Sequence, residues 1–242
     1  MVRSATLKGM GILDFIFPKY CVNCKKLGSY LCANCLTFIS FDTEEICVVC
    51  NRPAINGLTH PGCLGKHTIN GVFSAIAYKG AAKKLIYNFK YKPYLADLKN
   101  VLVDLFYENL IQKEEFYSVC KNNKSLIFLV PIPLHSSKLR SRGYNQAEIL
   151  AAALSKKLGF PTANLLKRLK KTPSLAGLTQ KIRKANIKGA FEVEKDKKEI
   201  LKNAIIFLVD DIFTTGATLN EAAKMLKKSG AKKVYGLALA RD

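Results

Sequence analysis

The chain has 242 residues, of which 49% are hydrophobic and 24% are charged, and its formal net charge is +21. This balance is typical of a folded, water-soluble protein and excludes a disordered chain, and no apolar run reaches the roughly 18 residues of a membrane-spanning helix. The length accommodates one α/β domain and a small module, and we expect the division to fall between residues 1–70 and 71–242.

The first apolar stretch is LKGMGILDFIFP, residues 7–18. A secretory signal has an uninterrupted apolar core and a small-residue cleavage site. Here Asp14 interrupts the core, no such site follows, and cysteine pairs begin at once. We therefore expect an N-terminal helix rather than a signal peptide, in a cytoplasmic protein that does not insert into membranes.

Seven of the eight cysteines and one histidine form four pairs, each with two residues between the partners. This is the spacing of a zinc knuckle, in which both side chains turn toward one tetrahedral ion. Disulfides would leave one cysteine unpaired, would not explain the histidine, and need an oxidising compartment. We predict two structural Zn²⁺ sites, in preference to one zinc, disulfides or an iron–sulfur cluster, with the ligands Cys21, Cys24, Cys32, Cys35, Cys47, Cys50, His60 and Cys63.

Two pairings of these ligands are open at this point. Sequential pairing assigns the first four ligands to one ion and the last four to the other, and a crossed pairing would use the same eight residues. Because protein atoms fill every corner of each site, we expect no catalysis at zinc. A segment with so few large apolar side chains is expected to need metal in order to fold, and it would serve as a docking surface or a nucleic-acid contact.

After the cysteines, the sequence alternates between strand and helix patterns. We predict a strand at 71–79, a helix at 81–91, a second helix from about 95 to 112, and a strand at 125–133 that ends in two prolines. A loop at 134–146 then leads to a helix at 147–158, and a last strand is predicted at 232–240. This order predicts an α/β fold with a mostly parallel sheet and flanking helices.

The stretch IIFLVDDIFTTGAT, residues 205–218, is the strongest functional signal. The apolar run at 205–209 predicts a buried strand, and the spacing after residue 218 predicts a helix that ends at Gly230. The loop between them lies where a helix N-terminus offers unpaired N–H groups to an anion, and Gly216 allows the backbone to approach it. Neither a P-loop nor a dinucleotide motif occurs in the chain.

Asp210 and Asp211 would repel a phosphate that lay against them. They are better suited to accept hydrogen bonds from ligand hydroxyls or to hold water around Mg²⁺, so the implied ligand is a sugar phosphate. The alternative is that Asp211 only caps a turn and that Asp210 is a satisfied acid at the end of a strand.

The basic charge is concentrated between Leu134 and Phe191, where thirteen Lys or Arg residues accompany one acid, Glu148. Such a field attracts a pyrophosphate-bearing ligand or a nucleic-acid backbone. The alternative for the charge is a set of solvated lysines without a partner, and the alternative for the basic loop after 125–133 is a mobile, solvated connection. We expect the loop after 125–133 and the Thr/Gly loop to bind opposite ends of one ligand at the same edge of the sheet.

Two carboxylates followed by Thr-Thr-Gly-x-Thr resemble the PRPP-binding loop of type I phosphoribosyltransferases. Together with LDFIFPKYCVNC, AYKGAAKKLIYNFKY, VPIPLHSSKLRSRGYNQA and RKANIKGAF, this stretch resembles the ComF/ComFC competence-protein family almost from end to end. That family consists of amidophosphoribosyltransferase-like proteins needed for DNA uptake in naturally transformable bacteria. In one departure, Thr172-Pro-Ser-Leu175 stands where the family commonly has Thr-x-x-Gln, so any role of that Gln is absent or moved.

The resemblance implies a type I phosphoribosyltransferase-like domain behind a double zinc ribbon, and a pentosyl transfer from PRPP with Mg²⁺ to an acceptor that the sequence does not identify. We expect Asp210 and Asp211 to orient the ribose and Lys90 to close over the site. The residues expected to bind the 5′-phosphate are Thr214, Thr215, Gly216, Ala217 and Thr218. Those expected around the diphosphate are Pro131, Ile132, Pro133, Lys138, Arg140 and Arg142.

Two other functions are compatible with the same residues. The first is a catalytically silent protein that holds single-stranded DNA on its basic face and zinc module, with Tyr144 and Phe191 stacking on bases. The second is a PRPP-sensing scaffold whose zinc ribbons recruit a helicase or another uptake protein.

Overall fold

The computed structural model describes residues 18–91, 98–121, 126–172 and 180–242. The expected N-terminal helix and the departure at Pro173–Leu175 lie outside these residues.

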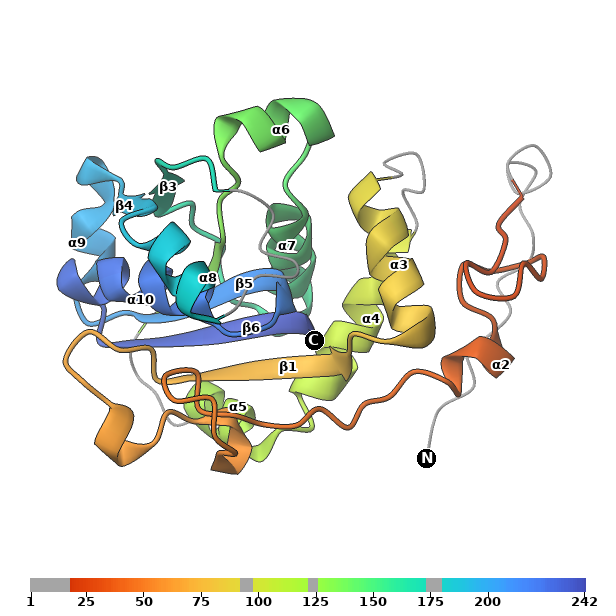
Figure 1. Cartoon of the computed structure of the whole chain (residues 1–242), viewed down its shortest axis with the longest axis horizontal. Helices are drawn as coiled ribbons and strands as arrows, with labels where there is room; N and C mark the ends of the chain where they lie inside the picture. Colours follow the sequence, from red (N-terminus) through yellow and green to blue (C-terminus); the bar gives the residue numbers. More distant parts are fainter. Residues whose placement is uncertain (1–17, 92–97, 122–125, 173–179) are drawn as a thin grey trace.

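Four parallel strands form the main sheet, in the order β1 (Gly71–Ala77), β6 (Lys233–Arg241), β5 (Ile205–Phe213) and β2 (Ile127–Pro131). The expected α/β fold with a parallel sheet is therefore confirmed (Figure 1). Residues 205–209 of β5 are fully buried, as expected for a central strand that is covered on both faces. Because all four strands run in the same direction, their carboxyl ends meet at one edge of the sheet.

One face of the sheet is covered by α3 (Gly80–Tyr91), α4 (Leu98–Leu110), α5 (Glu114–Lys121) and α7 (Gln146–Leu158). Their apolar side chains, among them Leu102, Phe106 and Leu150, pack with Phe207 and Tyr235 of the sheet. The helix α5 was not predicted, since only eight residues form it. Its Phe116 is nevertheless buried and contacts the rings of Phe73 and Phe207.

The opposite face is covered by α10 (Ala217–Lys228), against which α8 (Gln180–Ile187) and β4 (Phe191–Val193) pack. β4 pairs antiparallel with β3 (Leu166–Arg168), and a short turn η3 (Lys195–Lys197) and α9 (Lys198–Leu201) lead back to β5. Figure 1 shows β3, β4 and α8 grouped beside α10. This small second sheet was not predicted because strands of three residues have no readable alternation.

In residues 18–70, the part of the zinc module that the structure describes, there is little regular structure beyond α2 (Ala33–Leu36), η1 (Ile55–Gly57) and η2 (Pro61–Cys63). Its chain runs alongside β1, where the Ala77 N–H donates to the carbonyl of Ser40 (Figure 1). We call residues 20–36 the first ribbon and residues 46–63 the second ribbon. The first packs Val22 into the core on the α3–α4 face, and the second packs Ile46 and Val48 into the core on the α10 face.

Two predicted elements were wrong in extent. Most of the predicted loop 134–146 is a helix, α6 (Ser136–Arg142), because His135 Nδ1 accepts from the N–H of Ser137 and Gly143 ends the helix in the left-handed conformation. The strand predicted at 205–209 continues to Phe213, because β6 pairs with it as far as Arg241. The two aspartates therefore lie within the strand rather than after it.

Among the described helices, none combines the length and the apolar character that a membrane crossing requires.

Candidate functional site

The turn between β5 and α10, which we call the phosphate loop (Thr214–Thr218), has the geometry of an anion site. Gly216 stands at the N-cap with φ +68°, a left-handed conformation that favours glycine. The first hydrogen bond of α10 runs from the N–H of Asn220 to the carbonyl of Gly216, so the N–H groups before it have no intrahelical partner. These N–H groups and three threonine hydroxyls can therefore surround a phosphate.

The two aspartates next to this loop have different surroundings. The Oδ2 of Asp211 forms an ion pair with Lys90 Nζ at 3.0 Å, and the Oδ1 of Asp210 accepts from the N–H of Asp211 at 2.9 Å. Burial, with the neighbouring charge of Asp211, raises the pKa of Asp210 to about 7. The pair thus combines one ion-paired carboxylate with one carboxyl group that exchanges a proton near neutral pH.

Lys90 and Arg168 lie near these carboxylates, and further cations lie near those two. Burial lowers the pKa of Lys138, and the charges of Arg168, Arg142 and Lys90 lower it further, which indicates that the four cations lie close together. The nearby charge of Asp210 raises the pKa of Arg168, which burial lowers. Four cations beside only two carboxyl groups leave an excess of positive charge, which is unfavourable in itself, and an anionic ligand would relieve it.

Two residues of this site were missed in the sequence. Arg168, on β3, donates to Thr172 Oγ1 and lies over the ring of Phe191. Arg183, on α8, donates to Thr214 Oγ1 at 2.5 Å. The only signal for Arg183 was its place in the family-like string RKANIKGAF, and Arg168 had no signal because its approach to Asp210 depends on tertiary structure.

Within the described residues, two buried donors beside the cation group have no hydrogen-bond partner, Arg168 Nε and Gln146 Nε2, and a third, Arg241 Nε, lies where β6 ends. Gln146 accepts from Arg142 at 2.6 Å through its other amide atom, Oε1. Buried donors are rarely left unpaired, so the two beside the cation group indicate a ligand or water there.

The remaining residues predicted around the diphosphate are distributed unevenly. Pro131 ends β2, and the N–H of Ile132 donates to Val209 next to the aspartates. Pro133 follows before α6. Arg142 points toward α3, where it lies over the ring of Tyr91, whereas Arg140 is exposed on α6.

The two aromatic residues expected to stack on bases are both held by contacts within the fold. Phe191 is 2% exposed within the core, and Tyr144 donates its hydroxyl to the carbonyl of Phe89. The role predicted for Phe191 is therefore wrong, because β4 turns its side chain inward. Tyr87 and Tyr91 on α3 are instead each 57% exposed, with ring centroids 4.8 Å apart.

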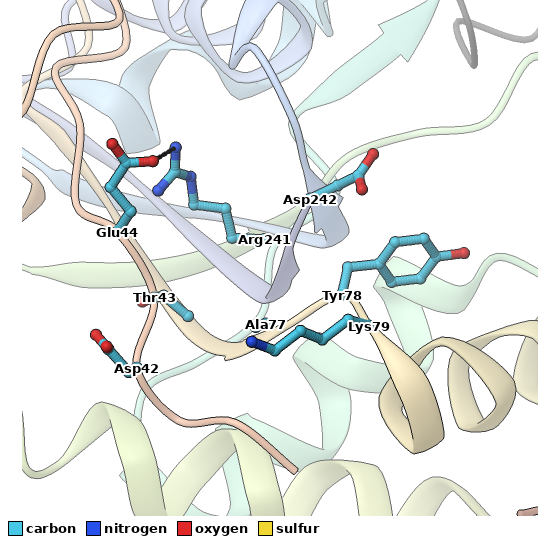
Figure 2. Close-up of a pocket in the computed structure, with 8 residues that line it drawn as sticks. All are labelled: Asp42, Thr43, Glu44, Ala77, Tyr78, Lys79, Arg241 and Asp242. Carbon is cyan, nitrogen blue, oxygen red and sulfur yellow. Dashed lines mark hydrogen bonds and ion pairs between the residues drawn. The ribbon is translucent and has the colours of Figure 1, made fainter. Parts of the chain in front are cut away.

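A hollow of about 320 Å³ lies where β1 and β6 end (Figure 2). Arg241 points across it to form an ion pair with Glu44, which lies between the two ribbons, at 3.2 Å. Tyr78 lies at its border, and the charges of Lys90 and Asp211 act on the pKa of this phenol, which burial raises. The hollow therefore adjoins the carboxylate pair along the same edge.

The eight predicted metal ligands form two groups in the structure, and the distances between their ligand atoms decide the pairing. Cys21, Cys24, Cys32 and Cys35 form one group, and Cys47, Cys50, His60 and Cys63 form the other, with the ligand atoms of each group within 4.8 Å of one another. The sequential pairing is confirmed. The Sγ atoms of Cys24 and Cys32 are 3.6 Å apart, and tetrahedral Zn–S bonds of about 2.3 Å require about 3.8 Å.

The histidine of the second group has the orientation of a metal ligand. Its Nδ1 lies 3.4 Å from Cys50 Sγ, and its Nε2 lies 2.9 Å from the carbonyl of Pro53. A zinc-bound histidine usually donates its other N–H to such an acceptor, which fixes the ring. The donor set and geometry therefore fit two zinc ions, each held entirely by protein atoms.

Two family models match separate parts of the chain. Residues 12–64 match the double zinc ribbon domain, and residues 144–241 match the phosphoribosyl transferase domain. The second match includes α7, the phosphate loop and β6, so it agrees with the parallel sheet and the loop described above.

Three curated proteins are similar to the chain. Competence protein F of Haemophilus influenzae is 41% identical over 114 residues, which are 47% of this chain and 49% of that protein. DNA utilization protein YhgH of Salmonella typhimurium is 32% identical over 47% of this chain and 48% of that protein. Competence protein ComFC of Bacillus subtilis is 27% identical over 88% of this chain and 84% of that protein. The chain thus spans about half the length of the first two relatives.

Proposed function

Because the chain belongs to the ComF/ComFC competence-protein family, we propose that it is a PRPP-binding phosphoribosyltransferase that acts in DNA uptake in the cytoplasm. One observation supports this most strongly. The phosphate loop, a carboxylate pair and a group of four cations lie along one edge of a parallel sheet. This order matches the 5′-phosphate, the ribose hydroxyls and the diphosphate of PRPP.

Each part of the site has a distinct task in this proposal. The N–H groups and hydroxyls of Thr214–Thr218 hold the 5′-phosphate, and Arg183 orients the hydroxyl of Thr214. Asp210 and Asp211 accept hydrogen bonds from the ribose hydroxyls, and the same carboxylates suit the water shell of Mg²⁺, which would neutralise part of the diphosphate charge.

The chemical step is the departure of pyrophosphate from C1 of the ribose. The C1–O bond breaks, its electron pair leaves with the pyrophosphate, and the ribose develops oxocarbenium character before an acceptor forms the new bond at C1. Lys138, Arg142 and Arg168 stabilise the departing charge, and the fixed ribose keeps C1 aligned with the acceptor. Lys90 leaves Asp211 for the diphosphate when PRPP binds.

Calorimetry with Mg²⁺–PRPP tests this proposal. The Asp210→Asn/Asp211→Asn variant is expected to lose at least tenfold in affinity, about 1.4 kcal/mol. The matched control is Asp104→Asn, because Asp104 is also an ion-paired aspartate, with Lys157 at 2.9 Å, but lies on α4 outside the site. Unchanged affinity in the double variant would refute the assignment of the carboxylates, and the absence of PRPP binding to the wild-type protein would refute the function.

A second candidate function, single-stranded DNA binding, is supported by the exposed tyrosine pair. Tyr87 and Tyr91 lie one turn apart on α3, and Arg142 of α6 lies over the ring of Tyr91. Lys84 of α3 donates to Asn23 of the first ribbon. Aromatic rings bordered by cations stack on bases and contact the backbone. The two functions are compatible, and a helicase or another uptake protein could receive the strand.

Fluorescence anisotropy with an oligonucleotide at several salt concentrations tests this surface. Tyr87→Ala/Tyr91→Ala is expected to weaken binding at least about thirtyfold, since each of the two stacked bases contributes about 1–3 kcal/mol. The control is Tyr117→Ala, because this tyrosine of α5 is also exposed and also lies beside a lysine, Lys121. Affinity that is independent of salt, or equal losses in the two variants, would argue against DNA binding at α3.

A further inference from the structure

The second zinc ribbon packs directly on the phosphate loop. Val48 is the residue after the zinc ligand Cys47, and it is 1% exposed. A Cβ atom built on Gly216 would lie 1.7 Å from Val48 Cγ2 and 2.8 Å from the ring of Phe213. Gly216 is thus required for two reasons, its left-handed backbone and the contact with Val48.

Further contacts join the same two regions. Lys184 Nζ donates to the carbonyl of Val49 at 3.1 Å, and the adjacent Arg183 donates to Thr214 of the loop. Beyond the ribbon, the N–H of Ile69 donates to Asn220 Oδ1 at 3.4 Å, and Asn220 forms the first hydrogen bond of α10 with Gly216. The loop is therefore bounded by the second ribbon on one side and by α8 on another.

We propose that the second ribbon positions the phosphate loop through Val48, so that metal binding at Cys47, Cys50, His60 and Cys63 is coupled to ligand binding at the loop. The proposal deepens the proposed function and rests on it for the identity of the ligand. The physical reason is local. Cys47 and Cys50 fix the backbone on both sides of Val48 only while both bind one ion, and a released knuckle no longer holds Val48 against Gly216.

Such coupling is reciprocal by thermodynamic necessity. If the metal-bound ribbon strengthens PRPP binding by some factor, bound PRPP strengthens metal binding in the second ribbon by the same factor. The first ribbon provides an internal comparison, because Cys21-Val-Asn-Cys24 repeats the pattern Cys47-Val-Val-Cys50. Its valine, Val22, packs into the core on the α3–α4 face and not against the loop.

The first test compares Val48→Ala with Val22→Ala by calorimetry with Mg²⁺–PRPP on the zinc-loaded protein. We expect Val48→Ala to weaken binding by about 5- to 30-fold, and Val22→Ala to change it less than twofold. Thermal unfolding of both variants shows whether each one is folded. Equal affinities of the two folded variants would overturn the proposal.

The second test needs no PRPP and therefore separates this proposal from the proposed function. Cysteines of the zinc-loaded protein are pulse-labelled with N-ethylmaleimide in the presence of a chelator, and the peptides of each ribbon are quantified by mass spectrometry. Gly216→Ala is expected to accelerate labelling of Cys47, Cys50 and Cys63 several-fold and to leave the first ribbon unchanged. The control is Gly159→Ala, which has a similar φ of +76° and no atom within 4 Å of the new Cβ.

Equal labelling rates in Gly216→Ala and Gly159→Ala would overturn the coupling even if PRPP binds. Suppose that labelling is accelerated in Gly216→Ala and that the wild-type protein does not bind PRPP. This combination would support the coupling and refute the proposed ligand. In a protein that binds PRPP, saturating ligand is expected to slow labelling of the second ribbon only, and equal protection of both ribbons would contradict the proposal.

Discussion

The two zinc ribbons share the ligand spacing Cys-x₂-Cys, yet their neighbours differ. The first ribbon packs Val22 beside α3 and α4, and Lys84 of α3 donates to its Asn23 at 3.0 Å. The second packs Val48 against Gly216 of the phosphate loop. Both ions are expected to stabilise the fold. Only the second has a ligand, Cys47, whose neighbour in the sequence, Val48, touches the loop. The role of a structural metal therefore depends on the side chains that its ligands hold in place.

Among the changes that would distinguish the two ribbons, loss of a zinc ligand is expected to have the largest effect on stability and on PRPP affinity. Cys50→Ser and Cys24→Ser are each expected to lower the free energy of unfolding by several kcal/mol, because structural zinc contributes directly to folding. Cys50→Ser is also expected to abolish PRPP binding below its melting temperature, whereas folded Cys24→Ser retains it within about threefold. Thermal unfolding and calorimetry measure both effects, and equal losses of PRPP affinity would remove the distinction between the ribbons.

The titration of Asp210 provides a test that involves neither ribbon, because Asp210 lies on β5 beside the phosphate loop. Burial raises the pKa of Asp210 to about 7, above the ~3.9 of an unfolded aspartate. Between these values the folded protein binds more protons than the unfolded chain, so the contribution of Asp210 to stability falls as pH rises from about 4 to 7.

We therefore expect Asp210→Asn to be more stable than the wild-type protein at pH 8, by up to about 4 kcal/mol, and nearly equal to it at pH 4. Denaturant unfolding across this pH range measures the difference. Asp104→Asn on α4 serves again as the control, and parallel stability curves for Asp210→Asn and the wild-type protein would show that Asp210 titrates normally.

The smallest effects concern the polar contacts of each ribbon with the helices. Lys113 Nζ forms an ion pair with Glu45, next to the second ribbon, at 2.8 Å, and both side chains are partly exposed. Lys113→Ala and Lys84→Ala are each expected to lower stability by less than about 1 kcal/mol. Only Lys113→Ala is expected to weaken PRPP binding, by less than about threefold. A loss above 2 kcal/mol in either variant would mean that polar contacts, rather than valine packing, attach the ribbons.

The metal ligands and the phosphate loop could be predicted because their chemistry is local. A spacing of two residues brings two side chains to one ion wherever the ribbon lies, and the order strand, Thr/Gly turn, helix leaves the first N–H groups of the helix unpaired within a dozen residues. The sequence left the pairing of the ligands open, since sequential and crossed pairings use identical spacings. Only the fold, which separates Cys35 from Cys47 along β1, distinguishes them.

The missed features depend on contacts between distant segments. Arg168 and Asp210 are far apart in sequence, and the contact of Val48 with Gly216 joins residues from opposite ends of the chain. The helix α6 was read as a loop because its basic residues lack an apolar stripe, and its cap at His135 is an unusual one. Phe191 was read as exposed because the basic charge around it concealed that its strand turns it inward.

A crystal structure of the zinc-loaded protein with Mg²⁺ and PRPP would show whether the phosphate loop, supported by the second ribbon, holds the ligand. We expect the 5′-phosphate within hydrogen-bond distance of the N–H groups of Thr215–Thr218, the ribose hydroxyls on Asp210 and Asp211, and Val48 still in contact with Gly216. Ligand bound instead in the hollow at Arg241, with the phosphate loop empty and the carboxylates uncontacted, would contradict it.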